Sequence, residues 1–277
     1  MKQSALPEPR RELAAFFTAA FFVSWLLWFP ALPVGNRIFF AELPHDFLLR
    51  AGSFGPSAAG LLLAYKFGGK TELRALLKSM WTIRIRPNWL LLLFLTMPGV
   101  SAVSCLIVFL SGGSLPEPQF SPWFVPVAFL YILVLMGPLG EEAGWRGFAL
   151  KRMLTLFSPL KAAVLLGGIW SLWHLPLFFI EGTTQNLLAG FGFLPAFCCY
   201  LLYTVMISIL ITLFFVKSGG SVLAAILSHT MGNLSLGCMP LIFSKGGALL
   251  LLLVLGGACF GFVYLCRGVM LNRKVSP

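Results

Sequence analysis

The chain alternates long apolar runs with short polar segments, and this alternation is its clearest pattern. An apolar run of about 17 to 25 residues is long enough to cross the hydrocarbon core of a bilayer as an α-helix. We predict eight such spans, approximately Leu13–Leu32, Phe47–Phe67, Trp89–Leu110, Trp123–Leu139, Leu160–Ile180, Ala196–Val216, Ser221–Leu236 and Gly247–Cys266. The pattern therefore predicts an all-α, polytopic membrane protein of about eight transmembrane helices.

A shorter amphipathic segment lies between the second and third predicted spans. In residues 71–80, helical spacing collects four apolar side chains on one face, Leu73, Leu76, Leu77 and Met80. Arg74 and Lys78 fall on a different face. We expect this segment to form a helix on the cytoplasmic surface of the membrane. The sequence shows no repeat and no soluble region, so residues 1–277 are treated as a single domain.

Composition supports the membrane assignment and excludes one other class. Hydrophobic residues make up 58% of the chain and charged residues 10%, which is more apolar surface than a soluble core of this length would bury. The formal charge of +11 could suggest a nucleic-acid partner, but the basic residues are spread through short loops between apolar runs. We therefore expect no nucleic acid. The six cysteines form no CxxC pair and indicate neither a disulfide framework nor a thiolate zinc site.

The distribution of Lys and Arg predicts an orientation. With the amino terminus in the cytoplasm, seventeen basic residues fall in cytoplasmic segments, from Lys2 at one end to Lys274 at the other. The opposite side holds only Arg37 and Lys245, with Arg50 near a helix end. Because cytoplasmic loops are enriched in Lys and Arg, we predict an integral membrane protein with both termini in the cytoplasm. In a bacterial source this would be the inner membrane.

The segment GPLGEEAGWRG, residues 137–147, places Glu141 and Glu142 directly after an apolar run in a chain with only nine acidic residues. A carboxylate at membrane depth is destabilised by several kcal/mol unless it is paired, protonated or facing water. If the fourth helix continues past both glutamates toward Lys151, a rise of 1.5 Å per residue sets Glu141 roughly 15 Å below the cytoplasmic surface. Pro138 removes one helical hydrogen bond, which suggests irregular backbone along the wall of a polar cavity.

Two histidines and one asparagine reach a similar depth on other spans. The same rise places His174 roughly 20 Å into the fifth span, and His229 and Asn233 roughly 12 and 18 Å into the seventh. His229 and Asn233 are four residues apart and share a helical face. A lone intramembrane His or Asn is usually an interhelical hydrogen-bond partner. Convergence of three helices at the depth of Glu141 instead favours a site in a cytoplasm-facing polar cavity.

The spacing also divides the roles of the two glutamates. Glu142 and Arg146 form an i, i+4 pair with the acid on the N-terminal side, so Arg146 can hold Glu142 ionised and fixed. Glu141 points about 100° away around the helix axis. It has no cation nearby in the sequence, which leaves it available for proton transfer.

Three motifs resemble those of the CAAX protease and bacteriocin-processing family of intramembrane endopeptidases, and are similar to those of type II CAAX prenyl endopeptidases. They are Glu-Glu-x-x-x-Arg at residues 141–146, aromatic-x-x-x-His at 170–174 and His-x-x-x-Asn at 229–233. The resemblance covers residues 137–236, which would be the catalytic core, and eight spans agree with the family's fold. Trp170 stands where the commonest motif has Phe, and we expect this to change a packing aromatic but no polar group.

The resemblance implies hydrolysis of a peptide bond inside the bilayer. Glu141, with His174, would polarise a water molecule and take its proton as it attacks the scissile carbonyl. His229 and Asn233 would donate hydrogen bonds to the oxyanion, each worth roughly 3 to 4 kcal/mol in comparable sites. The residues that would orient these groups are Glu142 and Arg146.

A metal cofactor is the main chemical alternative. Glu141, His174 and His229 could ligate Zn²⁺ and leave one position open for water. The sequence contains no HExxH helix, however, and Asn233 is a poor zinc ligand but a good amide donor. We therefore expect no metal, with Zn²⁺ as the alternative.

Two other functions use the same polar cluster. A transporter could relay protons or coordinate an ion there, although no matching pair of broken helices in two halves of the chain supports it. A noncatalytic membrane scaffold or bacteriocin immunity protein would keep the fold and bind a peptide or another membrane protein. For an enzyme, we expect a peptide or protein substrate, including one lipidated at its C-terminus. No residue selects among substrates or sets the oligomeric state.

Overall fold

The computed structural model describes residues 9–34 and 45–272, and across these two ranges the chain forms helices and no strands. The prediction of an all-α, polytopic membrane protein is confirmed. Four residues used to predict the orientation, Lys2, Arg37, Arg273 and Lys274, lie outside the described ranges. The cytoplasmic placement of both termini therefore stays a prediction.

Seven of the described helical stretches are long and apolar enough to cross a membrane: Pro9–Ala31, Asp46–Ser79, Pro87–Leu110, Pro122–Leu156, Pro159–Phe179, Phe193–Lys217 and Gly246–Leu265. The predicted seventh span corresponds to a shorter helix of 17 residues, α12 (Val222–Cys238). This helix packs against α5, α6 and α11 and buries most of its residues inside the protein. Since protein surrounds it, α12 does not need the length of a lipid-facing span.

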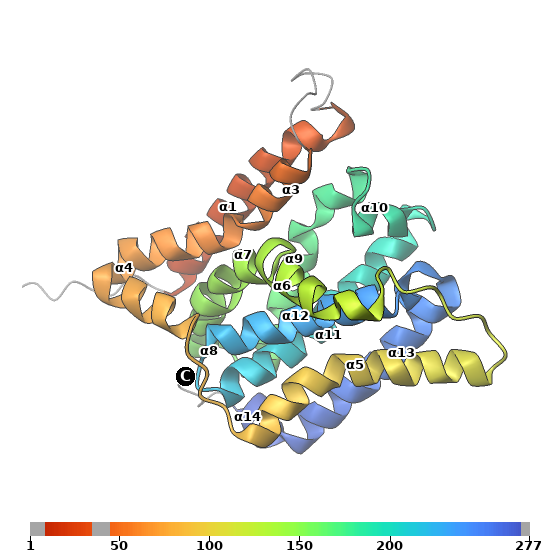
Figure 1. Cartoon of the computed structure of the whole chain (residues 1–277). Helices are drawn as coiled ribbons and strands as arrows, with labels where there is room; N and C mark the ends of the chain where they lie inside the picture. Colours follow the sequence, from red (N-terminus) through yellow and green to blue (C-terminus); the bar gives the residue numbers. More distant parts are fainter. Residues whose placement is uncertain (1–8, 35–44, 273–277) are drawn as a thin grey trace, which may run out of the picture.

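The helices are arranged in three parts (Figure 1). On one side, α1 (Pro9–Trp28) packs against α3 (His45–Ser53) and α4 (Gly55–Ser79). On the other, α5 (Pro87–Leu110) packs against α13 (Lys245–Leu265). Between them lie α12 and the paired helices α9 (Pro159–Trp173) and α11 (Phe193–Lys217). Both histidine motifs belong to this central part, and the glutamate motif lies on the fourth span, between it and α4.

Close contact between α9 and α11 depends on a small residue. A Cβ placed on Gly167 of α9 would lie 2.6 Å from the Cα of Val205 and 3.0 Å from the Cβ of Ser208, both on α11. Small residues let membrane helices approach each other closely, and the resulting van der Waals packing stabilises the pair. This packing fixes the wall against which the polar residues lie.

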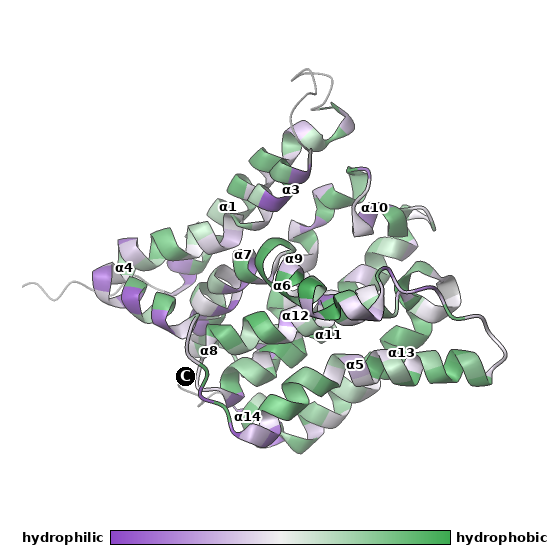
Figure 2. Ribbon diagram, in the orientation of Figure 1, coloured by the Kyte–Doolittle hydropathy of each residue, from purple (hydrophilic) through white to green (hydrophobic). Residues whose placement is uncertain are grey.

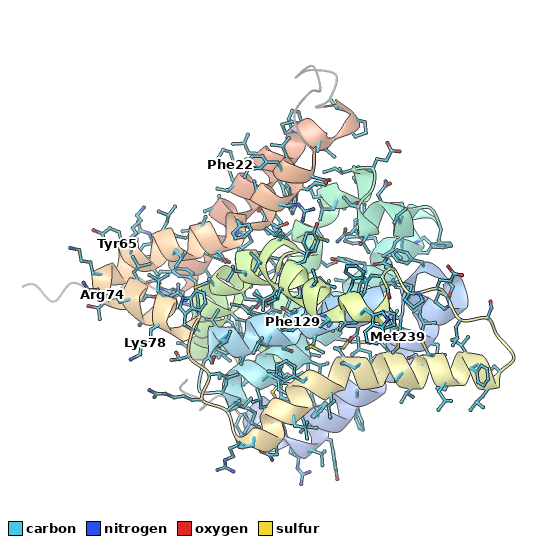
Figure 3. The ribbon with its side chains drawn as sticks, in the orientation of Figure 1. Phe22, Tyr65, Arg74, Lys78, Phe129 and Met239 are labelled. Carbon is cyan, nitrogen blue, oxygen red and sulfur yellow. The ribbon has the colours of Figure 1, made fainter. Side chains whose placement is uncertain are left out.

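The predicted amphipathic helix forms the second part of α4, after a kink. At the kink Gly69 adopts φ 65° and ψ −161°, a conformation that glycine allows. Beyond it Leu76 and Met80 are buried, whereas Leu77, which we expected on the same face, is largely exposed. The part of the apolar face formed by Leu76 and Met80 packs against the rest of the protein. Figure 3 shows Arg74 and Lys78 at this end of the molecule, extending away from it.

The fourth predicted span does not continue as one helix, which corrects the sequence prediction. Helix α6 (Val125–Leu135) ends, and the chain turns at Gly137, whose φ is 108°. Pro138 then starts a new helix, at the position where its missing N–H has no intrahelical partner to lose. The new helix has three sections: α7 (Pro138–Glu142), a π-helical segment η3 (Ala143–Leu150) and α8 (Lys151–Leu156).

An ionic cluster joins the end of this span to the first part of the bundle. The Arg152 guanidinium pairs with Glu12 of α1 and, at 2.9 Å, with Glu72 in the second part of α4. Arg152 also lies over the ring of Phe148. The cluster ties three helices together where hydrophilic residues gather in Figure 2, while hydrophobic residues dominate along α5 and α13.

Candidate active site

Glu142 is the charged centre of the site. Its side chain has no exposure, and its Oε1 accepts hydrogen bonds from Arg146 Nη1 at 2.7 Å and from His229 Nδ1 at 2.8 Å. The predicted pair of Glu142 and Arg146 is therefore confirmed. Because a carboxylate only accepts, the His229 proton in this bond sits on Nδ1, and Nε2 is left for another partner. The Arg146 guanidinium also lies 4.8 Å from the centre of the Trp170 ring.

Glu141 lies in the first turn of α7 and faces the protein interior rather than lipid, with 4% of its surface exposed. Its Oε2 accepts a hydrogen bond of 2.7 Å from Trp170 Nε1. Its Oε1 lies beside Gly137, where an added Cβ would come within 2.4 Å of that oxygen and 3.8 Å of His229 Cε1. The carboxyl group of Glu141 and the imidazole of His229 therefore both lie close to Gly137.

His174 ends α9 and is also buried. Its Nδ1 lies 2.7 Å from the backbone oxygen of Trp170, and since a carbonyl oxygen only accepts, Nδ1 donates this bond. Nε2 is then the nitrogen that can face a substrate or a water molecule. Trp173 and Tyr200 pack edge-on against the ring at centroid distances of 4.6 and 5.3 Å. The ring orientation is thus fixed by one hydrogen bond and two aromatic contacts.

Trp170 connects the two halves of the site, and here the sequence-based expectation was wrong. We expected an aromatic packing residue without polar consequence, but the indole N–H binds Glu141 and the backbone oxygen binds His174. The ring also packs edge-on against His229 at 5.0 Å. A phenylalanine at this position could pack but could not donate to Glu141.

Asn233 lies one helical turn beyond His229 and belongs to the rim of the site. Its Nδ2 donates a hydrogen bond of 3.3 Å to the backbone oxygen of Met136, at the break between α6 and α7. One amide N–H therefore supports the broken backbone. Because a side-chain amide carries two donor protons, the other can still donate. Its role toward an oxyanion stays a prediction.

Sequence reasoning missed two tyrosines on α11 that border the site. Tyr200 packs against His174, and its hydroxyl accepts a hydrogen bond of 2.9 Å from Gln185 Nε2. Tyr203 follows three residues later on the same face. Both fall in an apolar run, so the only signal in the sequence was two hydroxyl-bearing aromatics at helical spacing.

Both tyrosines also line an apolar cavity of about 320 Å³. It lies between α10 (Thr184–Ala189), α11, η5 (Leu241–Phe243) and α13. Its other walls include Leu188, Phe191, Ile242 and Leu252. The sequence predicted a polar cavity facing the cytoplasm, which stays a prediction, and the cavity that the structure shows beside Tyr200 is apolar.

The arrangement of possible metal ligands is a separate question. Within residues 9–34 and 45–272, no three His, Cys, Asp or Glu side chains are grouped so that they could hold a metal ion. One nitrogen of His174 and one of His229 are already engaged, and one oxygen of Glu141 accepts from Trp170. Metal independence and the Zn²⁺ alternative both stay predictions.

Comparison with known proteins agrees with the motifs. Residues 122–235 match the family model described as type II CAAX prenyl endopeptidase Rce1-like, and the match includes all three motifs. The chain is also similar to CAAX prenyl protease 2 of Methanococcus maripaludis, with 28% identity over 233 residues, which are 79% of this chain and 82% of that protein. The resemblance inferred from the motifs is confirmed, and these names indicate a protease.

Proposed function

We propose that this protein, whose motif-bearing segment matches the type II CAAX prenyl endopeptidases, is an intramembrane endopeptidase with Glu141 as its general base. One observation carries the proposal. A glutamate carboxyl group is buried in the protein interior, held by the Trp170 N–H, next to the imidazole of His229. An acid in such a position is expected to have a functional role.

The chemistry follows from the two carboxyl oxygens of Glu141. Trp170 occupies Oε2, so Oε1 is the oxygen that accepts a proton from the attacking water. His174, with its Nδ1 proton held by the Trp170 backbone, can accept a hydrogen bond from the same water through Nε2. The water oxygen bonds to the scissile carbonyl carbon. The carbon–nitrogen bond then breaks, and the proton on Glu141 passes to the leaving amine.

We propose that His229 and Asn233 stabilise the oxyanion. Nε2 of His229 can donate only when the ring carries both protons, and the resulting charge would lie against the Glu142 carboxylate at 2.8 Å. Arg146 donates to the same oxygen of Glu142 and balances its charge. The second amide proton of Asn233 is the other proposed donor. Glu142 and Arg146 thus orient the donors and do not touch the substrate.

The substrate we propose is a membrane-associated protein with a prenylated C-terminal tail, as the name of the similar protein indicates for that enzyme. The apolar cavity behind Tyr200 supports this choice because it could take an apolar chain close to His174.

We propose that the reaction needs no metal, since no three His, Cys, Asp or Glu side chains in the described part of the chain are grouped as a ligand set. Zinc chemistry is the alternative. A strong chelator separates the two, since metal-free hydrolysis should be unaffected.

The test uses purified protein in detergent and a prenylated CaaX peptide. We expect the wild type to cleave it, Glu141→Gln and His174→Ala to lose cleavage, and chelation to change nothing. Glu181→Gln, which alters an exposed glutamate, is the matched control and should cleave normally. Equal cleavage by all variants would contradict the proposal. Peptide binding without cleavage in the wild type would favour the noncatalytic alternative.

A further inference from the structure

Tyr203 carries a buried hydroxyl that the proposed mechanism does not use. Only 7% of its surface is exposed, and its hydroxyl has no hydrogen-bond partner in the described part of the chain. Nearly all buried polar side-chain atoms in proteins have a partner, so an unpaired one calls for an explanation. Tyr200, one turn earlier, has such a partner in Gln185.

The hydroxyl of Tyr203 points to the helix that carries two candidate site residues. A Cβ placed on Gly232 of α12 would lie 3.7 Å from this oxygen. Gly232 directly precedes Asn233 and follows His229 by three residues. Without a side chain at Gly232, nothing on that residue covers the hydroxyl.

Tyr203 also belongs to the wall of the apolar cavity. Tyr203 lines this cavity together with Tyr200, whose ring contacts His174. Tyr203 therefore stands at the boundary between an apolar cavity and the polar site, with a free donor at that boundary.

We propose that the Tyr203 hydroxyl donates a hydrogen bond to a backbone carbonyl of the bound peptide. This inference rests on the proposed function. An apolar group of the substrate would fill the cavity while the scissile bond lies at Glu141, and Tyr203 would hold the peptide between them. Tyr203 is then a substrate-binding residue and transfers no proton.

Another residue of α11 provides the matched control. Ser208 also has a buried hydroxyl without a partner among the described residues, but it packs against Gly167 of α9 and does not line the cavity. Ser208→Ala therefore removes an equally buried hydroxyl from the same helix, away from the proposed peptide path.

The test measures binding of a prenylated CaaX peptide in the inactive Glu141→Gln background, and turnover in the otherwise wild-type protein. Loss of one neutral hydrogen bond should raise the peptide Kd roughly three- to tenfold in Tyr203→Phe. KM should rise by a similar factor, with kcat within about twofold, because the contact is present in both ground and transition states. Ser208→Ala should change neither value, and both variants should keep the wild-type melting temperature.

An unchanged Kd in Tyr203→Phe would overturn the inference, as would an equal change in Ser208→Ala or a loss confined to kcat. The proposed function has a separate test, because it fails if the wild type does not cleave the peptide or if Glu141→Gln cleaves like the wild type. An unchanged Kd alongside an inactive Glu141→Gln would therefore reject the role of Tyr203 alone.

Discussion

Two prolines in two membrane spans show how differently the periphery and the interior of this protein are built. Pro98 lies inside α5, yet this helix continues from Pro87 to Leu110. The fourth span is broken: α6 ends at Leu135, the chain turns at Gly137, and a new helix starts at Pro138. The same residue type thus leaves one helix continuous and begins another.

The surroundings explain the difference. Most of α5 faces outward with large apolar side chains, so an interruption would expose unpaired backbone groups to lipid. At the break in the fourth span Met136 is 47% exposed, Gly137 and Pro138 are buried, and Asn233 donates to the Met136 backbone oxygen. Every residue of the π-helical segment that follows is buried. In the fourth span the irregular backbone thus lies where Asn233 satisfies one of its carbonyl groups, and that place carries the site.

The interior and the periphery of the protein also differ in how they hold charge. Removing a buried cation should have the largest effect on stability. Arg146→Met leaves Glu142 fully buried without its cation, which should lower the free energy of unfolding by about 3 to 5 kcal/mol. Arg50→Met is the control, since Arg50 pairs with the exposed Asp46 at 4.0 Å and its loss should change stability by less than about 1 kcal/mol. Denaturant unfolding in detergent measures both. Equal losses would contradict the proposed difference between interior and periphery.

Removing the indole donor should affect catalysis more than stability. Trp170→Phe keeps an aromatic ring but loses the 2.7 Å hydrogen bond to Glu141. A hydrogen bond to a charged group contributes about 1.5 to 3 kcal/mol, so kcat/KM should fall roughly 10- to 100-fold. Trp25→Phe loses a bond to the backbone oxygen of Trp173, which is not a proposed reacting group, and should stay within about threefold of the wild type. Wild-type kinetics in Trp170→Phe would show that Glu141 does not need this donor.

Two glycines provide the next comparison. Gly137→Ala places a side chain where φ is 108° and where a Cβ would meet Glu141 Oε1 at 2.4 Å. Backbone strain alone should destabilise the protein by about 1 to 3 kcal/mol, and cleavage should fall with it because Glu141 is displaced. In α13, Gly257→Ala meets no atom within 4 Å and should stabilise the helix by up to about 1 kcal/mol. Melting temperatures that move in the same direction would contradict this account.

The smallest effect is expected at the lipid-facing surface. Leu253 of α13 is 70% exposed, so Leu253→Ala removes few protein contacts and should change stability by less than about 0.5 kcal/mol. Leu255 on the same helix is fully buried, and Leu255→Ala should lower stability by about 2 to 5 kcal/mol. If both variants lose the same stability, the outer face of α13 is not a lipid-facing surface.

Much of this architecture could be read from the sequence because it depends on local spacing. Apolar runs of membrane length predicted the spans, and the i, i+4 spacing predicted the ion pair of Glu142 and Arg146, which the structure shows at 2.7 Å. His174 and His229 were also singled out by position, and Trp170 contacts both rings.

The features that the sequence did not predict depend on contacts between distant residues. Pro138 suggested irregular backbone, but Pro98 lies inside a continuous helix, so the residue type alone did not predict that the helix would end. The contact at the break comes from Asn233, 97 residues beyond Met136. The donor of Trp170 finds Glu141 at a separation of 29 residues. Neither contact leaves a periodic signal, because both arise only when the helices pack.

The central claim is that Glu141 activates the water that cleaves the peptide bond, and the turnover rate of Glu141→Gln measures it most directly. The amide of glutamine can still accept from Trp170 but is a very weak base. A general base contributes roughly 10²- to 10⁴-fold, so kcat on a prenylated CaaX peptide should fall by at least about 100-fold. A Glu141→Gln protein that cleaves within about threefold of the wild-type rate would contradict the account.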